Sequence, residues 1–276
     1  MKNALIFGAI LVIFSISLVV AGVPNFQLND VVPSNGRASV VIPETAVEVA
    51  DGVFSLGSVT DIDGRIVQGF MFVDYKKENA KPPWAGGGNG GGESSCFAFL
   101  SKGAKWKSVE PYLVDPVNNA GLDELFVRNN LASDIIEWEN AAGTDILGNE
   151  INGVVDRANI GNLNGKNEVI FADVGSEGAI AVTIVWGIFS GPPFARELVE
   201  WDQVYDDVDF IWANNGDPNA MDFENIAQHE LGHSVGMGHP ESSCIDETMY
   251  AFASNGETKK RDLNTGDVAG VNDLYS

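Results

Sequence analysis

Histidine and cysteine are scarce in this sequence. Its 276 residues include only three histidines and two cysteines. Two cysteines allow one intrachain disulfide at most, which excludes a disulfide-rich domain held together by several bonds of this kind. A site built from imidazole side chains must draw on very few residues, so the positions of the three histidines carry unusual weight.

Basic side chains are also few. Only 16 Lys and Arg stand against 39 Asp and Glu, which gives a formal net charge of −23. Nucleic acids and anionic membrane surfaces need Lys and Arg to neutralise their phosphates. We therefore expect no nucleic-acid partner, and an anionic membrane surface is a poor one. Such acidity suits either a plainly solvated surface or loops that hold calcium, and composition does not choose between the two.

One long apolar run is present, at residues 4–23. Val19 and Ala21 are the small residues that a signal peptidase needs for cleavage after Ala21. The run is also long enough to span a bilayer uncleaved. Residues 1–21 are therefore either a signal peptide or a membrane anchor, and in the second case residues 4–23 tether the chain. Both interpretations predict a secreted or extracellular protein.

Export bears on the two cysteines. In an oxidising compartment Cys96 and Cys244 are the one intrachain pair, and we expect a disulfide between them. It would close a loop of roughly 150 residues, worth about 5 kcal/mol in the chain-entropy model. Two alternatives stay open: two free, buried thiols, or a Cys96 thiolate that blocks a metal site.

A Pro- and Gly-rich stretch at residues 81–95 divides the chain and is interpreted as a linker. With 45% apolar residues and no internal repeats, the chain can bury one good core and a small second one. Residues 22–80 are expected to form a β-rich N-terminal region, a candidate pro-region. Its strands are predicted at Val53–Leu56 and Ile66–Val73, on either side of an Asp-Gly turn.

The pattern over residues 96–276 is α+β. Apolar residues at helical spacing and capping Asp or Asn residues predict the helices, and apolar runs between turn signals predict the strands. The predicted helices span residues 123–141, 223–235 and 265–274, and the predicted strands span 106–114, 168–173, 178–189 and 204–212.

All three histidines fall in one eleven-residue segment that begins at His229 and ends at His239. On a helix, His229 and His233 lie four residues apart, so both imidazoles project from one face and can bind the same ion. Gly236 can take the left-handed conformation that ends the helix and returns His239 as third ligand. Three imidazoles and one open position form the catalytic kind of zinc site. Glu230 is placed to reach a metal-bound water without binding the metal.

This extended motif resembles that of the metzincin metallopeptidases, in which a methionine turn follows. Met249 supplies the methionine ten residues after His239. Over roughly residues 96–276 the chain is most similar to the matrixin branch. The resemblance implies an α+β, metzincin-like catalytic domain with a twisted five-stranded mixed sheet and three helices, preceded here by the small β-rich region. It also implies that Met249 forms a hydrophobic floor under the zinc and that Asp267 hydrogen-bonds the backbone of the methionine turn.

Three features depart from the matrixin pattern. Pro240 follows the third ligand, as in the serralysin branch, where matrixins usually have serine. No histidine remains for the second, structural zinc of animal matrixins, so one zinc is expected. The N-terminal region lacks the Pro-Arg-Cys-Gly propeptide motif, and Cys96 lies where the family has no switch cysteine.

The resemblance implies an extracellular zinc metalloendopeptidase in which Glu230 is the general base for a zinc-activated water. Its partner would be an extended polypeptide paired with the strand at Gly178–Thr183, and the protein is expected to be a monomer. Structural calcium is a second expected cofactor, with candidate regions at Glu197–Asp209 and Asn162–Glu168. Two alternatives stay open: a non-catalytic zinc-containing binding or adhesion protein of the cell surface, and a zinc hydrolase that acts on something other than peptides.

Overall fold

The computed structural model describes residues 38–77 and 96–276. The expected signal or anchor at residues 1–21 and the expected linker at residues 81–95 lie outside the described residues. Within the described part of the chain, no helix is long and apolar enough to cross a membrane.

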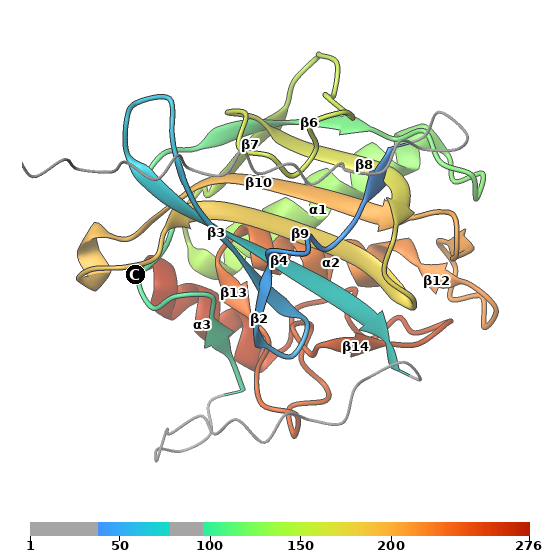
Figure 1. Cartoon of the computed structure of the whole chain (residues 1–276). Helices are drawn as coiled ribbons and strands as arrows, with labels where there is room; N and C mark the ends of the chain where they lie inside the picture. The colour runs from blue at the N-terminus through green and yellow to red at the C-terminus, as the bar shows by residue number, and fades with distance from the viewer. Residues whose placement is uncertain (1–37, 78–95) are drawn as a thin grey trace, which may run out of the picture.

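Most strands join one mixed sheet in the order β2-β3-β4-β9-β10-β8-β6-β7, with β1 beside β8 and β14 beside β4 (Figure 1). Neighbours among β10, β8, β6 and β7 run parallel, whereas β9 runs antiparallel to both β10 and β4. The bounds are β1 Ser39–Val40, β2 Val47–Ala50, β3 Val53–Thr60, β4 Ile66–Lys76, β6 Glu110–Asp115, β7 Leu147–Glu150, β8 Asn167–Val174, β9 Ala179–Ile188, β10 Glu197–Asp206 and β14 Phe252–Ala253.

Two short ribbons complete the strands. β5 (Ala98–Phe99) pairs antiparallel with β13 (Met237–Gly238), and β11 (Trp212–Ala213) pairs parallel with β12 (Met221–Asp222). The β5–β13 ribbon matters for the site, because it holds the turn that follows the second histidine.

Three helices, α1 (Glu124–Ala142), α2 (Phe223–Ser234) and α3 (Thr265–Tyr275), lie on one side of the sheet (Figure 1). Each begins at a polar cap: the side chains of Asp123 and Asp222 accept hydrogen bonds from backbone N–H groups of the first turn, and Asn264 forms a capping box with Asp267. The predicted α+β class, with three helices and a mixed sheet, is confirmed. Residues 96–276 contribute the five neighbouring strands β7, β6, β8, β10 and β9, and the short strand β14 beside β4.

The sheet has an apolar cluster on each face, because side chains alternate along every strand. On β9, Ala181 and Val185 belong to the cluster that contains the helices, whereas Val182 and Ile184 belong to the other. β4 contributes to both in the same way, with Phe72 on the helical face and Met71 on the other.

The N-terminal strands are an integral part of this sheet. The predicted strands at Val53–Leu56 and Ile66–Val73 are present within β3 and β4, but they do not form a region apart. β4 pairs with β9 from Gln68 to Tyr75, and the Cα partners include Phe72 with Thr183. Sequence patterns could not show this pairing, because it joins segments about a hundred residues apart along the chain.

One strand prediction is wrong in position. The sequence predicts a strand over residues 204–212, and the acidic stretch that starts at Glu197 is predicted to be either a calcium region or a solvated face. In the structure that acidic stretch is β10, and the strand ends at Asp206. Glu200 and Asp202 fit inside a buried strand because backbone N–H groups of the 161–168 segment donate hydrogen bonds to their carboxylates.

Candidate metal centre

Helix α2 and the turn after it bring the three histidines together. His229 and His233 lie one helical turn apart on α2, with ring centroids 4.9 Å apart. The backbone then turns at Gly236, whose φ of 103° lies in the left-handed region that favours glycine. From there the chain passes through β13 and places the His239 ring 4.8 Å from the His233 ring.

Backbone carbonyls fix the tautomer of two of these rings. The Nδ1–H of His229 donates to the Thr248 carbonyl at 2.6 Å, and that of His233 donates to the Met237 carbonyl at 3.0 Å. Each ring therefore turns an Nε2 lone pair toward the centre of the cluster. This arrangement is usual for histidines that bind a metal.

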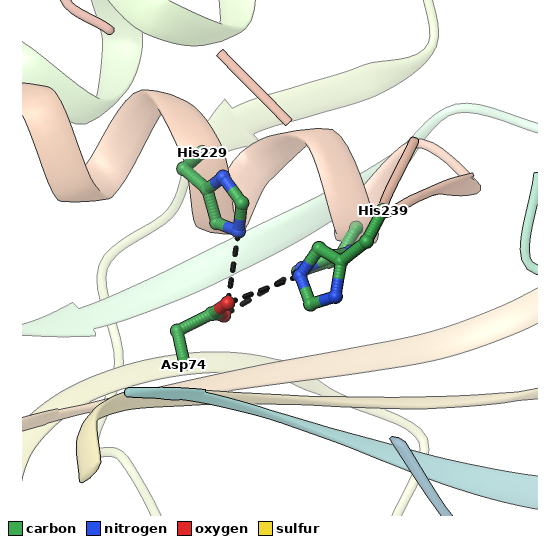
Figure 2. Close-up of side chains that lie close together, drawn as sticks. Asp74, His229 and His239 are labelled. Carbon is green, nitrogen blue, oxygen red and sulfur yellow. Dashed lines mark hydrogen bonds and ion pairs between the residues drawn. The ribbon is translucent and has the colours of Figure 1, made fainter. Parts of the chain in front are cut away.

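A fourth ligand group comes from β4, where Asp74 points at the histidines (Figure 2). Its Oδ1 lies 3.0 Å from the Nε2 atoms of both His229 and His239, and its Oδ2 lies 3.6 Å from His233 Nε2. His233 Nε2 and His239 Nε2 are themselves 3.1 Å apart. Ligands at 2.0–2.1 Å around a tetrahedral zinc would be about 3.4 Å from one another, so these spacings suit one ion.

The chemistry of the donor set also fits zinc. Burial lowers the pKa of His229 to about 3, and burial likewise lowers the pKa of His233, so both rings are neutral ligands. Burial alone would raise the pKa of Asp74, but without a metal the attraction of a proton shared with the His229 and His239 rings holds that pKa well below its ordinary value. A divalent cation would replace this proton. Neutral imidazoles beside an ionised carboxylate are the protonation state that a divalent cation requires.

Glu230 lies on α2 beside the cluster and is completely buried. Its Oε2 accepts a hydrogen bond from the Thr183 hydroxyl of β9 at 2.5 Å. Its Oε1 makes no hydrogen bond, and neither does Asp74 Oδ2. Burial, reinforced by the Asp74 carboxylate, raises the pKa of Glu230 well above its ordinary value. Asp74 Oδ2, which makes no hydrogen bond, and the Nε2 lone pairs of His229 and His233 are what a buried cation would satisfy.

The methionine turn packs directly under this cluster. Met249 is fully buried, and its sulfur lies so close to α2 that a Cβ on Gly232 would fall 2.1 Å from it. Asp267, in the first turn of α3, accepts hydrogen bonds from the backbone N–H groups of Thr248 at 2.7 Å and Met249 at 3.1 Å. One carboxylate thus ties α3 to the turn, through the backbone hydrogen bonds that the resemblance implies for Asp267.

The two cysteines form a disulfide between Cys96 and Cys244, with Cα atoms 5.5 Å apart. The bond links the first described residue after the 78–95 segment to the loop that leads into Met249. Neither sulfur is a free thiol. The alternative in which a Cys96 thiolate blocks the metal therefore has no support in this structure.

Sequence reasoning missed two residues near the cluster. Asp74 is the one charged residue between Ile66 and Tyr75, and an isolated acid in an apolar strand was the available signal. Lys260 is almost fully buried, with its Nζ 3.5 Å from His229 Nδ1 and donating to the Tyr250 carbonyl. Burial lowers the pKa of Lys260 to about 8.

A second group of acids is buried between β8 and β10. Glu168, Glu200 and Asp202 are each at most 1% exposed. Both calcium candidate regions contribute to this group, but its carboxylates accept hydrogen bonds from backbone N–H groups of the 156–168 segment. Among the described residues, the ligand atoms that converge within 4.8 Å of one another are those of Asp74 and the three histidines.

Comparison with known proteins places this centre in a family. The matrixin family model matches residues 194–276, which contain α2, all three histidines, Met249 and Asp267. Residues 194–276 belong to a matrixin domain. The metzincin, matrixin-like resemblance seen in the sequence is confirmed, and the matched residues of the matrixin domain include the whole metal centre except Asp74.

Individual relatives match over short segments of the chain. The chain is 38% identical over 76 residues to Metalloendoproteinase 2-MMP of Arabidopsis thaliana, which covers 25% of this chain and 19% of that protein. It is 48% identical over 56 residues to Metalloendoproteinase 1-MMP of the same plant, covering 20% and 15%. It is 39% identical over 69 residues to human Matrilysin, covering 25% of each. The matched segment thus spans a quarter or less of these relatives.

Proposed function

We propose that this chain is a zinc-dependent endopeptidase whose zinc is held by His229, His233 and His239. The observation that carries the proposal is the convergence of three imidazole Nε2 atoms beside a buried glutamate that is not one of the converging ligands. A site that only stores metal has no need of Glu230, whereas hydrolysis needs a base next to the metal-bound water. The names of the relatives, metalloendoproteinases and matrilysins, support the same reaction.

Zinc bound at this site would polarise a scissile carbonyl and bring the pKa of its water to about 7. Glu230 would accept a proton from water at Oε1, which makes no hydrogen bond, while the Thr183 hydroxyl holds Oε2 in place. The same carboxyl would return the proton to the departing amine. Met249 packs against helix α2. The hydrogen bonds from His229 to the Thr248 carbonyl and from His233 to the Met237 carbonyl keep these two rings oriented.

The substrate is proposed to be a polypeptide in extended conformation. The predicted free edge at Gly178–Thr183 is wrong for this structure, because β9 pairs with β10 on one side and with β4 on the other. A peptide that took the place of β4 would meet the backbone N–H and C=O groups of β9. We further propose that residues 96–276 are the peptidase unit and that the chain acts as a monomer outside the cytoplasm. The apolar run at residues 4–23 and the Cys96–Cys244 disulfide support the location, because disulfides persist in oxidising compartments. Whether residues 4–23 are removed or retained as a tether decides between a secreted and an anchored form.

Structural calcium is proposed at the buried acids Glu168, Glu200 and Asp202. Its support is that burial and the charges of Glu200 and Glu168 raise the pKa of Asp202 well above its ordinary value. Among the described residues, the ion pair of this group is that of Glu168 with the half-exposed Lys166, at 3.8 Å. A hard cation with oxygen ligands would offset the repulsion among the three carboxylates.

A casein zymogram of the full chain tests the endopeptidase. SDS disrupts the native packing, and renaturation in zinc buffer restores the metal site before activity is read. A zone of casein lysis that disappears with a zinc chelator is the expected result. Absence of lysis from protein that still holds one zinc would instead favour the non-catalytic binding protein. Lysis that survives the chelator would contradict zinc catalysis.

A further inference from the structure

The geometry points to a positioning role for two buried polar residues of the sheet, Thr183 and Gln203, which together hold the turn of α2 that carries Glu230. This inference rests on the proposed function, in which Glu230 is the general base. It adds the residues that fix the direction of the Glu230 carboxyl, one through a direct hydrogen bond and the other through Ser234.

Thr183 and Gln203 form a polar pair on the face of the sheet that α2 covers. They are Cα partners in the antiparallel pairing of β9 with β10, so both side chains lie on the same face. Helix α2 contacts both strands on this face. The residues two positions before and after each of them belong to the apolar cluster that contains the helices: Ala181, Val185, Trp201 and Tyr205. Thr183 and Gln203 are thus two polar side chains within an otherwise apolar face.

Thr183 bonds directly to the proposed base. Its hydroxyl donates to Glu230 Oε2 at 2.5 Å, and both residues are 0% exposed. The Glu230 carbonyl lies 3.4 Å from the same hydroxyl, which has one proton and gives it to the closer oxygen. Since Oε2 is held from β9, the oxygen left to accept a proton is Oε1, which makes no hydrogen bond.

Gln203 acts through Ser234, which lies one helical turn after Glu230. Its Nε2 donates to Ser234 Oγ at 3.0 Å, and the Ser234 hydroxyl donates to the Glu230 carbonyl at 3.3 Å. The Tyr205 hydroxyl donates to Gln203 Oε1 at 2.8 Å, which fixes the orientation of the amide. Every hydroxyl proton in this chain of bonds has one acceptor, so the network is fully satisfied and directional.

Filling space does not require this polar pair. Valine at position 183 and methionine at position 203 would occupy similar volumes and add apolar area to the cluster. Hydrogen bonds are directional, so the polar pair instead fixes one position of α2 relative to β9 and β10. A general base needs such a fixed position, because a misplacement of about 1 Å can lower the rate about a hundredfold.

Two variants at position 183 test the direct bond. Thr183→Val keeps the shape and removes the donor, whereas Thr183→Ser keeps the donor and removes a methyl group. With dye-labelled casein and full-length protein of equal zinc content, kcat should fall at least about tenfold in Thr183→Val and less than about threefold in Thr183→Ser, with KM little changed. Packing alone predicts the opposite order, because serine leaves a void and valine does not. Thr183→Ser no more active than Thr183→Val would overturn the role of Thr183.

Gln203→Met tests the second support. It removes both bonding groups of the side chain at similar volume, and kcat should fall at least about threefold while KM stays within about twofold. The control is Ile184→Val, which removes one methyl group from β9 at a buried position on the opposite face of the sheet. This control should keep kcat within about twofold of the parent. A kcat for Gln203→Met equal to that of the control would overturn the role of Gln203.

Thermal unfolding tests the Thr183 bond without using activity. Thr183→Val is measured in the parent and in Glu230→Leu, which has no carboxylate to accept the bond, at the same zinc content. The substitution should lower the melting temperature of the parent by about 3 °C or more and that of Glu230→Leu by about 1 °C or less. Equal shifts in the two backgrounds would contradict a bond between Thr183 and Glu230.

The two kinds of measurement separate failure of this inference from failure of the proposed function. If the parent cleaves casein and Thr183→Val is as active as Thr183→Ser, the endopeptidase stands and the positioning role of Thr183 is refuted. If the parent does not cleave casein but the melting shifts depend on Glu230 as expected, the endopeptidase proposal fails, and Thr183 stands as the residue that holds the Glu230 carboxyl.

Discussion

The sulfur of Met249 lies against the backbone of Gly232, where a Cβ would fall 2.1 Å from Sδ and 2.7 Å from the Trp138 ring. Gly232 is in the interior of α2, a position where alanine normally favours the helix by about 1 kcal/mol. The steric conflict reverses that preference, because both neighbours are fully buried and cannot move aside. The methionine turn and the metal-binding helix therefore constrain each other at this contact.

Gly232→Ala is predicted to destabilise the protein by about 1–3 kcal/mol, the usual range for overpacking a core. Thermal unfolding followed by circular dichroism measures the loss. Ser133→Ala, at an exposed position of α1, is the control for an alanine placed in a helix and should leave the melting temperature almost unchanged. An unchanged melting temperature for Gly232→Ala would show that the Met249 contact is not tight.

Asp267→Ala is predicted to loosen the methionine turn. The substitution leaves the backbone N–H groups of Thr248 and Met249 buried without a partner, which costs about 1–3 kcal/mol for each group. Zinc loss to a chelator should become faster, because the Thr248 carbonyl also orients His229. Asp273→Ala, on the exposed side of the same helix, is the matched control. Similar melting temperatures and zinc retention in the two variants would contradict the role of Asp267.

Glu230→Ala is predicted to keep the zinc and lose turnover by about 10²–10⁴-fold, the scale expected when a general base is removed. His233→Ala should instead lose stoichiometric zinc, as measured by elemental analysis of purified protein. The pair separates proton transfer from metal binding, because the two side chains lie on the same helix. Activity of Glu230→Ala within a few-fold of the parent would show that another group is the base.

Local signals explain why much of the site could be predicted from the sequence. The spacing of His229 and His233, the glycine after them and the Asp222 cap all act within α2 and its turn, so one short segment contains the information. Asp74 is different, because it contacts His229 across 155 positions in the sequence. Only the pairing of β4 with β9 brings the two together, and no local pattern in β4 specifies its partner.

The position of β10 shows a second limit of the sequence. Judged by residue type alone, Glu200 and Asp202 indicate a solvent-exposed segment, because charged residues are rarely buried without partners. Their partners are backbone N–H groups of Gly161, Asn164 and Gly165, on a segment about 40 residues earlier. Hydrogen bonds to backbone groups leave no trace in residue types, so the strand was predicted several residues too late.

The Cys96–Cys244 disulfide is predicted to stabilise the fold by up to about 5 kcal/mol, since it closes a loop of 148 residues. Thiol titration of unfolded, unreduced protein should find no free thiol. Reduction, or the Cys96→Ser/Cys244→Ser double variant, should lower the melting temperature and speed zinc loss, because the bond anchors the loop before Met249. Two titratable thiols in the unreduced protein would rule the bond out.

The buried acids predict a pH dependence that calcium should modify. Burial raises the pKa of Glu200 from 4.5 to about 8, despite backbone N–H donors that act in the opposite direction. The folded protein thus holds a proton that the unfolded chain releases near pH 4.5. The stability that this proton contributes is complete below about pH 4.5 and is lost as the pH rises through 8.

In calcium-free buffer with zinc present, the melting temperature should therefore fall by roughly 3 °C or more between pH 5 and pH 8. Millimolar calcium should restore most of this loss at pH 8 and change little at pH 5, because the cation binds the ionised carboxylates and competes with the proton. Glu200→Gln imitates the protonated side chain, so its melting temperature should vary less with pH and respond less to calcium. A variant that follows the parent curve with and without calcium would remove Glu200 as the titrating group and the buried acids as the calcium site.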